Sequence, residues 1–145
     1  MPETSEEDLA AISQLRSSVM RLARRLRHQP VAESLSPTEM GVLGTLARCG
    51  QATPGELARR EHVQPPSMTR IVAMLEEKGL VRREPHPDDR RQVVVSSTEQ
   101  AEAILLESRR RRNAWLAEIA EGLDEDEWAT LRAAAPVLYK LAHLQ

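Results

Sequence analysis

Three helix-start signals lie close together in the middle of this chain, and they constrain its fold more than any other feature. Ser36-Pro37-Thr38-Glu39 and Thr53-Pro54-Gly55-Glu56 each join an N-cap hydroxyl to a proline at the first helical position and a glutamate that can bond back to the cap. In Gln64-Pro65-Pro66-Ser67, two prolines occupy a first turn, where their missing amides remove no helical hydrogen bond. The spacing therefore predicts three short helices in close succession.

A β-hairpin is predicted directly after the third helix, which Gly79 can end. Residues 80–84 and 92–96 form two short segments, and the β-branched run Val93-Val94-Val95 favours a strand in the second. Between them, Pro85-His86-Pro87-Asp88-Asp89-Arg90-Arg91 is a charged, turn-forming stretch. Three helices followed by a hairpin with a polar tip have the order of a winged helix-turn-helix.

Amphipathic helices are predicted on both sides of this unit. Residues 9–28 carry apolar side chains in steps of three and four, and residues 97–142 predict two further helices separated near Gly122, the second capped by Asp124. Their apolar seams lie outside the winged-helix core and need a partner surface, which predicts a dimer. The seam residues are Leu9, Ile12 and Val19 in the first helix and Leu131, Ala135 and Leu138 in the last.

Composition excludes several classes of protein. The 145 residues suit one globular domain or two intertwined parts, with 41% hydrophobic and 29% charged residues. No apolar run approaches the roughly 18–20 residues that a membrane span needs. The acidic residues 1–8 lack the pattern of a secretory signal, and a single cysteine allows no internal disulfide. We therefore expect a cytoplasmic protein with no membrane-spanning segment.

The net charge of −2 conceals a basic middle. Residues 59–92 hold eight basic against six acidic residues, and every basic residue there except Lys78 is an arginine, which is suited to forked contacts with phosphate and base edges. In a winged helix-turn-helix the second helix of the turn unit enters the major groove by its N-terminal half. That half is Gln64 to Arg70, and the periodicity places Pro66 and Arg70 on its outward face. These observations point to double-stranded DNA as a partner.

The residues of this region resemble the multiple-antibiotic-resistance regulator (MarR) family of bacterial transcription factors. The similarity is densest over about residues 53–98, and the order of helices before and after it also agrees, so that it covers nearly the whole chain. Single pieces of the pattern are weak, but their combination is specific. The matching residues are Leu57-Ala58, Val63, Ser67-Met68-Thr69-Arg70, Leu75-Glu76-Glu77-Lys78-Gly79-Leu80-Val81, Arg83 and Pro87-Asp88-Asp89-Arg90-Arg91.

The resemblance implies a mainly α fold with a small β-hairpin wing. Residues 36–97 would form the winged helix-turn-helix, and residues 1–35 and 98–145 a helical dimerisation region. Arg90 would reach the minor groove from the wing tip, with Arg91 beside it, and Asp89 would brace the wing, against Arg70. The DNA-facing positions of the recognition helix would be Gln64, Pro66, Ser67, Thr69 and Arg70.

This sequence departs from the family pattern at a few positions. Gln64 stands where the family usually has a serine N-cap, which leaves the start of the recognition helix less well defined. Ser97-Thr98 replaces the usual Leu-Thr pair after the second wing strand, and Ala101 replaces a glycine. None of the departures after the wing falls on an expected DNA contact.

The function expected from these residues is a sequence-specific, homodimeric transcriptional repressor of a pseudo-palindromic operator. The resemblance also implies a cleft between the dimerisation region and the DNA-reading unit, in which a small effector would act. No enzyme motif, cofactor loop or metal-ligand spacing is present in the sequence. Two alternatives stay open: a winged-helix ligand-binding or protein-interaction module without a role in transcription, and an oxidant sensor using Cys49, whose thiol we expect to be buried and inert.

Overall fold

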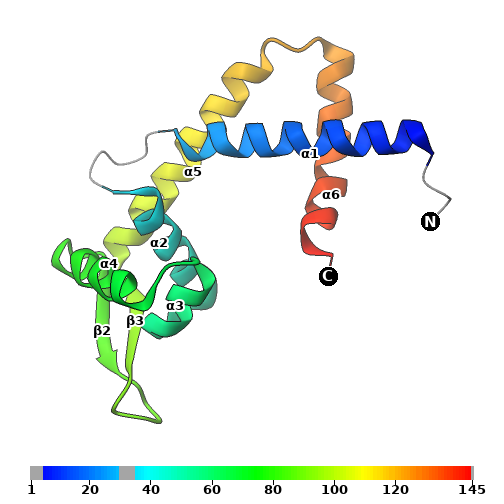
Figure 1. The fold of residues 1–145 in the computed structure, drawn as a ribbon. Coiled ribbons are helices and arrows are strands. Elements are labelled where there is room, and N and C mark those ends of the chain that lie inside the picture. Colours follow the sequence, from blue (N-terminus) through cyan, green and yellow to red (C-terminus); the bar gives the residue numbers. More distant parts are fainter. Residues whose placement is uncertain (1–4, 30–34, 145) are drawn as a thin grey trace.

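The computed structural model describes residues 5–29 and 35–144 as six helices and three strands (Figure 1). Residues 1–4 and 30–34 of the expected dimerisation region, and residue 145, lie outside the described residues. No helix within the described ranges is long and apolar enough to cross a membrane. In chain order the elements are α1 (Glu6–Arg27), α2 (Pro37–Cys49), β1 (Gln51–Ala52), α3 (Pro54–Arg60), α4 (Pro65–Glu77), β2 (Val81–Pro85), β3 (Val93–Ser97), α5 (Glu99–Ala120) and α6 (Glu125–His143).

The predicted helix starts are confirmed by their caps. The Glu39 amide donates to Ser36 Oγ over 3.1 Å and the Ser36 amide donates to Glu39 Oε2 over 2.6 Å, and Thr53 and Glu56 form the same box at α3. Gln64 precedes α4 without a side-chain cap bond, as its residue type predicts. The first helix begins earlier than expected.

An additional capping box explains the early start of α1. The Asp8 amide donates to Ser5 Oγ over 3.1 Å, and the Ser5 amide donates to Asp8 Oδ2 over 3.0 Å. The helix therefore runs from residue 6 rather than residue 9. Its acidic first turn and arginine-rich last turn also match the helix dipole.

The sheet has one more strand than the predicted hairpin. Strands β2 and β3 pair antiparallel from Val81 opposite Ser97 to Pro85 opposite Val93, and β1 adds to the other edge of β3, with Ala52 opposite Val95. Gly50, at φ +81°, turns the chain from α2 into this short strand. A two-residue strand carries too little periodicity to be found in the sequence.

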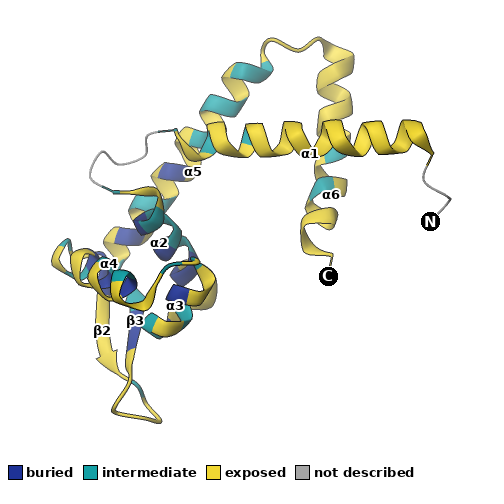
Figure 2. Ribbon diagram, in the orientation of Figure 1, coloured by how far each residue is buried: buried dark blue, intermediate teal, exposed yellow. Residues whose placement is uncertain are grey.

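The apolar core lies in the winged-helix part of the molecule (Figure 2). It is built from α2, α3, α4, the sheet and the first turn of α5, with Leu43, Leu57 and Met68 fully buried. Within the described residues of α1 and α6, by contrast, none is buried. Figure 1 shows these two helices and the far half of α5 extending away from the core.

A partly buried ion pair joins α2 to the end of α4. Lys78 Nζ lies 2.9 Å from Glu39 Oε1, and Glu39 is only 4% exposed. Burial by itself raises the pKa of the Glu39 carboxyl, but the hydrogen bond from the Ser36 amide and the Lys78 ammonium outweigh it and leave the pKa below its ordinary value. The Glu39 carboxyl is therefore ionised at neutral pH, and its contact with Lys78 links α2 to the end of α4.

Candidate DNA interface

The third helix of the core presents one apolar face inward and one polar face outward. Met68, Val72 and Leu75 of α4 are buried in the core, whereas Pro66 and Arg70 are exposed on the opposite side. The sequence periodicity predicted both faces correctly. An exposed face of this kind on the second helix of a helix-turn-helix is free to enter the major groove.

The first turn of α4 displays small polar groups rather than free amides. Pro65 and Pro66 have no N–H, so the Ser67 amide is the one remaining donor among the first three positions. Thr69 is exposed, and its hydroxyl donates to the carbonyl oxygen of Pro65 over 3.1 Å. Its oxygen and methyl group stay available to a partner. Ser67 is half-buried, and Gln64 is exposed just before the helix.

Arg70 is exposed and has no ion pair among the residues that the structure describes. The expected brace between Asp89 and Arg70 is absent from that part of the chain. Asp89 Oδ1 instead accepts a hydrogen bond from the Arg91 amide over 3.1 Å, within the wing tip. Aspartate side chains commonly accept a hydrogen bond from a backbone amide of their own turn. Because Asp89 does so here, the Arg70 guanidinium stays available to a partner.

A different ion pair connects the wing to the recognition helix. Arg83 of β2 donates two hydrogen bonds to the Glu76 carboxylate of α4, from Nε to Oε2 over 3.1 Å and from Nη2 to Oε1 over 2.7 Å. The hydrogen bond from Arg83 holds the pKa of Glu76 below its ordinary value, and the same bond raises the pKa of Arg83. Sequence reasoning missed this pair because opposite charges seven residues apart across a helix end have no characteristic spacing.

The wing tip carries two exposed arginines. Arg90 and Arg91 stand at the end of the hairpin that projects from the core in Figure 1, and neither forms an ion pair within residues 5–29 and 35–144. An exposed arginine on a narrow hairpin is the kind of group that inserts into a minor groove. The core therefore presents an outward helix face and a separate cationic tip.

Cys49 is exposed, so the expectation of a buried thiol is wrong. It occupies the last position of α2, where Gly50 turns the backbone into β1. The apolar stripe of α2 ends at Leu46, and the turn carries the next position of that face out of the core. The thiol is thus accessible to reagents, and the alternative of an oxidant sensor stays open.

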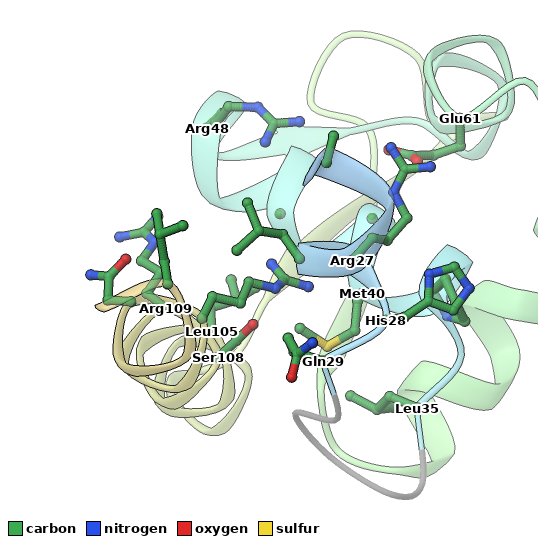
Figure 3. Close-up of a pocket in the computed structure, with 18 residues that line it drawn as sticks. Arg27, His28, Gln29, Leu35, Met40, Arg48, Glu61, Leu105, Ser108 and Arg109 are labelled. Carbon is green, nitrogen blue, oxygen red and sulfur yellow. The ribbon is translucent and has the colours of Figure 1, made fainter. Parts of the chain in front are cut away.

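A cleft of about 860 Å³ opens between α1, α2 and α5 (Figure 3). Ser108 of α5 is 1% exposed, its Oγ lacks a hydrogen-bond partner among the described residues, and Figure 3 shows it directed into the cleft. The Nε of Arg112 on the same helix is also buried without a partner in that part of the chain. The lining contains four arginines, at 27, 48, 109 and 112, and one carboxylate, Glu61.

This arrangement, a three-helix core with an exposed second helix in the turn unit and an arginine-tipped wing, defines a winged-helix DNA-binding protein. The MarR family model matches residues 35–93. The HTH-type transcriptional regulator ML2140 of Mycobacterium leprae is 43% identical over 136 residues, which cover 94% of this chain and 95% of the relative. The HTH-type transcriptional repressor MdtR of Bacillus subtilis is 30% identical over 110 residues, covering 76% of this chain and 69% of that repressor.

Solved structures agree over nearly the full length. A Pseudomonas aeruginosa PA01 protein designated a transcriptional regulator superposes with a TM-score of 0.83 at 33% identity, covering 97% of this chain and 99% of that one. A cysteine-to-serine variant of Escherichia coli MarR, solved with operator DNA, gives 0.60 at 27% identity over 92% of this chain and 95% of that one. The chain belongs to the MarR family of HTH-type transcriptional regulators, a family of DNA-binding proteins rather than enzymes.

Proposed function

We propose that the protein is a sequence-specific, homodimeric repressor that binds a pseudo-palindromic operator and leaves it when a small effector binds. Residues 36–97 would read the DNA, and residues 1–35 and 98–145 would form the dimer. The observation that carries this proposal is that an exposed α4 face around Arg70 and an exposed, arginine-bearing wing tip extend from one packed core. This role requires the protein to work in the cytoplasm, where bacterial operators lie.

The place of each residue in the fold supports its proposed contact with DNA. Pro66, Ser67, Thr69 and Arg70, with Gln64 before them, would face base edges and phosphates of the major groove. Arg90 would enter the minor groove, Arg91 would contact the nearby backbone, and Asp89 would hold the turn that carries both. Phosphate contacts then supply most of the affinity, and the α4 side chains supply the sequence preference.

The homodimer is supported by the apolar side chains that one chain leaves exposed. Leu9 and Ile12 of α1 are 58% and 53% exposed, and Trp128 and Leu131 of α6 are 44% and 41% exposed. Long helices without buried residues gain little stability from propensity alone and normally pack their apolar stripe against a partner. A second copy offers the same stripe and completes a symmetric interface.

The repressor role draws on the relatives. MdtR is named a repressor, and the E. coli MarR structure holds operator DNA. A dimer bound across an operator occupies two half-sites, whose centres lie one helical turn, or roughly 10 base pairs, apart. Such occupancy blocks a promoter that overlaps the site.

Gel retardation on the DNA that flanks the protein's own gene tests DNA reading. Arg90→Ala should weaken operator binding by roughly 1–3 kcal/mol, because it removes a cation from a narrow groove. Ser67→Ala and Thr69→Ala should instead relax the preference at one or two base pairs in each half-site.

Arg110→Ala is the matched control, since Arg110 is an exposed arginine on α5 that is not among the proposed DNA contacts. Equal affinity of Arg90→Ala and wild type at matched salt would overturn the assignment of the wing. Circular dichroism of each variant separates lost contacts from lost fold.

The cleft supports an anionic effector. The Ser108 hydroxyl and the Arg112 Nε, which have no partner among the described residues, are donors that a carboxylate can accept from, and burial makes leaving them unpaired unfavourable. Because α1 and α5 belong to the proposed dimer region and α2 to the DNA-reading core, a ligand seated there can change the separation of the two recognition helices.

Benzoate and its neutral amide, benzamide, test the charge requirement. Benzoate should lower operator affinity and benzamide should not, and Arg112→Met should abolish the response while Arg110→Met retains it. An equal response to the two compounds would contradict an anion site.

A further inference from the structure

The wing tip is held together by its own hydrogen bonds, and in most of them a backbone amide donates to the side chain of His86 or of Asp89. The His86 amide donates to the Gln92 carbonyl oxygen over 3.0 Å, and the Gln92 amide donates to the Asp89 carbonyl oxygen over 3.0 Å. The amides of Asp88 and Asp89 both point at His86 Nδ1, at 3.1 and 3.3 Å. The Arg91 amide donates to Asp89 Oδ1. The backbone amides of residues 88, 89, 91 and 92 therefore all have an acceptor within the tip.

The imidazole of His86 can serve this turn in only one chemical form. A neutral imidazole has one N–H donor and one acceptor nitrogen, whereas the imidazolium has two donors. Because two amide donors face Nδ1, that nitrogen must be the acceptor and the proton must lie on Nε2. His86 is also half-buried, while its neighbours in the tip, residues 87–92, are exposed. The ring is therefore the anchored part of an otherwise solvated loop.

We propose that His86 is a positioning residue for DNA binding, whose Nδ1 caps the amides of residues 88 and 89 and so holds Arg90 in the orientation that the minor groove needs. The inference rests on the proposed role of Arg90. A guanidinium on an unrestrained loop loses more conformational entropy on binding than one on a fixed turn, so a preformed tip gains affinity without adding a contact. His86 acts through Arg90 and need not touch DNA itself.

Two substitutions separate this role from a direct contact. In His86→Asn the amide Oδ1 can take the place of Nδ1 as the acceptor, but the variant lacks the Nε2–H that could reach a phosphate. In His86→Ala the acceptor is lost. We expect His86→Ala to weaken binding to operator DNA by about fivefold, since two modest hydrogen bonds are lost to water. We expect His86→Asn to bind like wild type.

A double-mutant cycle with Arg90→Ala measures the coupling between the two substitutions, and a merely structural role of His86 would not produce such coupling. If His86 works by placing Arg90, then His86→Ala should add little to the loss already caused by Arg90→Ala. Fluorescence anisotropy with labelled operator DNA at fixed salt measures all four proteins. Additive losses, or a His86→Asn variant as weak as His86→Ala, would overturn the proposal.

NMR of the wild-type protein without DNA tests the cap directly and needs no variant to fold. The ¹⁵N shifts of the His86 ring should show the Nε2–H tautomer, and the amides of Asp88 and Asp89 should exchange more slowly than the Arg90 amide, for which no acceptor is described within the tip. A ring protonated on Nδ1, or unprotected amides, would refute the cap. If the cap is present but Arg90→Ala binds as tightly as wild type, the proposed function of the wing fails instead.

Discussion

At the residue scale, the molecule depends on a few side chains whose surroundings were not evident from their neighbours in the sequence. Cys49 is the clearest case, because its position on an apolar helix suggested burial, whereas the turn at Gly50 leaves it exposed. Glu39 is the reverse case. It serves as a helix cap at the surface end of α2 and yet is buried, with Lys78 as its partner.

Cys49 should react with a thiol reagent in the folded protein at a rate close to that in denaturant, because no burial protects it. Ellman's reagent measures this rate. We expect peroxide to leave operator binding equally unaffected in wild type and Cys49→Ser, since Cys49 is not among the residues proposed to contact DNA. Release of DNA by peroxide in the wild type alone would favour the oxidant-sensor alternative.

Lys78→Met should make the protein more sensitive to acid. Because the pKa of Glu39 is lowered in the folded state, the carboxylate contributes stability above its unfolded pKa, and that stability is lost as pH falls through the folded pKa. Without Lys78 the folded pKa rises, so the loss begins at higher pH. Acid unfolding followed by circular dichroism should show an upward shift of the midpoint, with Lys140→Met, on exposed α6, as the control.

At the element scale, the central question is how the recognition helix and the wing keep one relative orientation. The Glu76–Arg83 pair joins them side by side, and the Thr98 hydroxyl donates to the Gly79 carbonyl oxygen over 2.8 Å at the end of α4. Gly79, at φ +74°, makes the sharp turn between α4 and the wing that no other residue type adopts as readily. These links make the two proposed reading elements a single unit.

Arg83→Ala should lower operator affinity more than it lowers the stability of the fold. The Glu76–Arg83 pair is exposed to solvent, and exposed ion pairs contribute little to the free energy of unfolding. Its loss nonetheless frees the wing to move against α4, so the two groove contacts no longer form together. Thermal unfolding and anisotropy measure the two effects, with Arg82→Ala, the neighbouring exposed arginine of β2, as the control. Unchanged affinity would show that the pair does not set the wing orientation.

At the scale of the whole molecule, one chain has a well-packed core and a helical half that lacks one. The contrast between α2–α4 and the pair α1 and α6 is visible in the burial pattern of Figure 2. A cation–π contact of Arg25 over Trp115, at 5.0 Å, ties α1 to α5. It is too small to replace an apolar interface, which is why the proposal needs a second copy.

Leu131→Glu should convert the proposed dimer into a monomer of 16.3 kDa without unfolding the winged-helix core. Leu131 is 41% exposed in the single chain, so the charge is tolerated there, but it would be desolvated in an interface between copies. Light scattering gives the mass, and Thr130→Glu, exposed beside the seam on α6, is the matched control. A wild-type protein that is monomeric at micromolar concentration would contradict the dimer.

Local sequence signals by themselves determined where α2 and α3 begin, placed the start of α4 near its two prolines, and indicated which face of α4 points outward and that a charged hairpin follows. Caps, prolines and apolar periodicity act within one or two helical turns, so helix starts and buried faces can be predicted from them without knowing the rest of the fold. The family pattern in the same stretch also identified the class of protein.

Only the tertiary structure decided which distant residues meet. The pairing of β1 with β3 and the Glu39–Lys78 and Glu76–Arg83 pairs all join segments that are separated along the chain. The burial of the Ser108 hydroxyl, without a partner among the residues that the structure describes, is likewise a result of packing. Such contacts depend on the packing of whole elements, and no local pattern of residue types encodes that packing. For the same reason, the brace expected between Asp89 and Arg70 proved to be a bond within one turn, and Cys49 proved to be exposed.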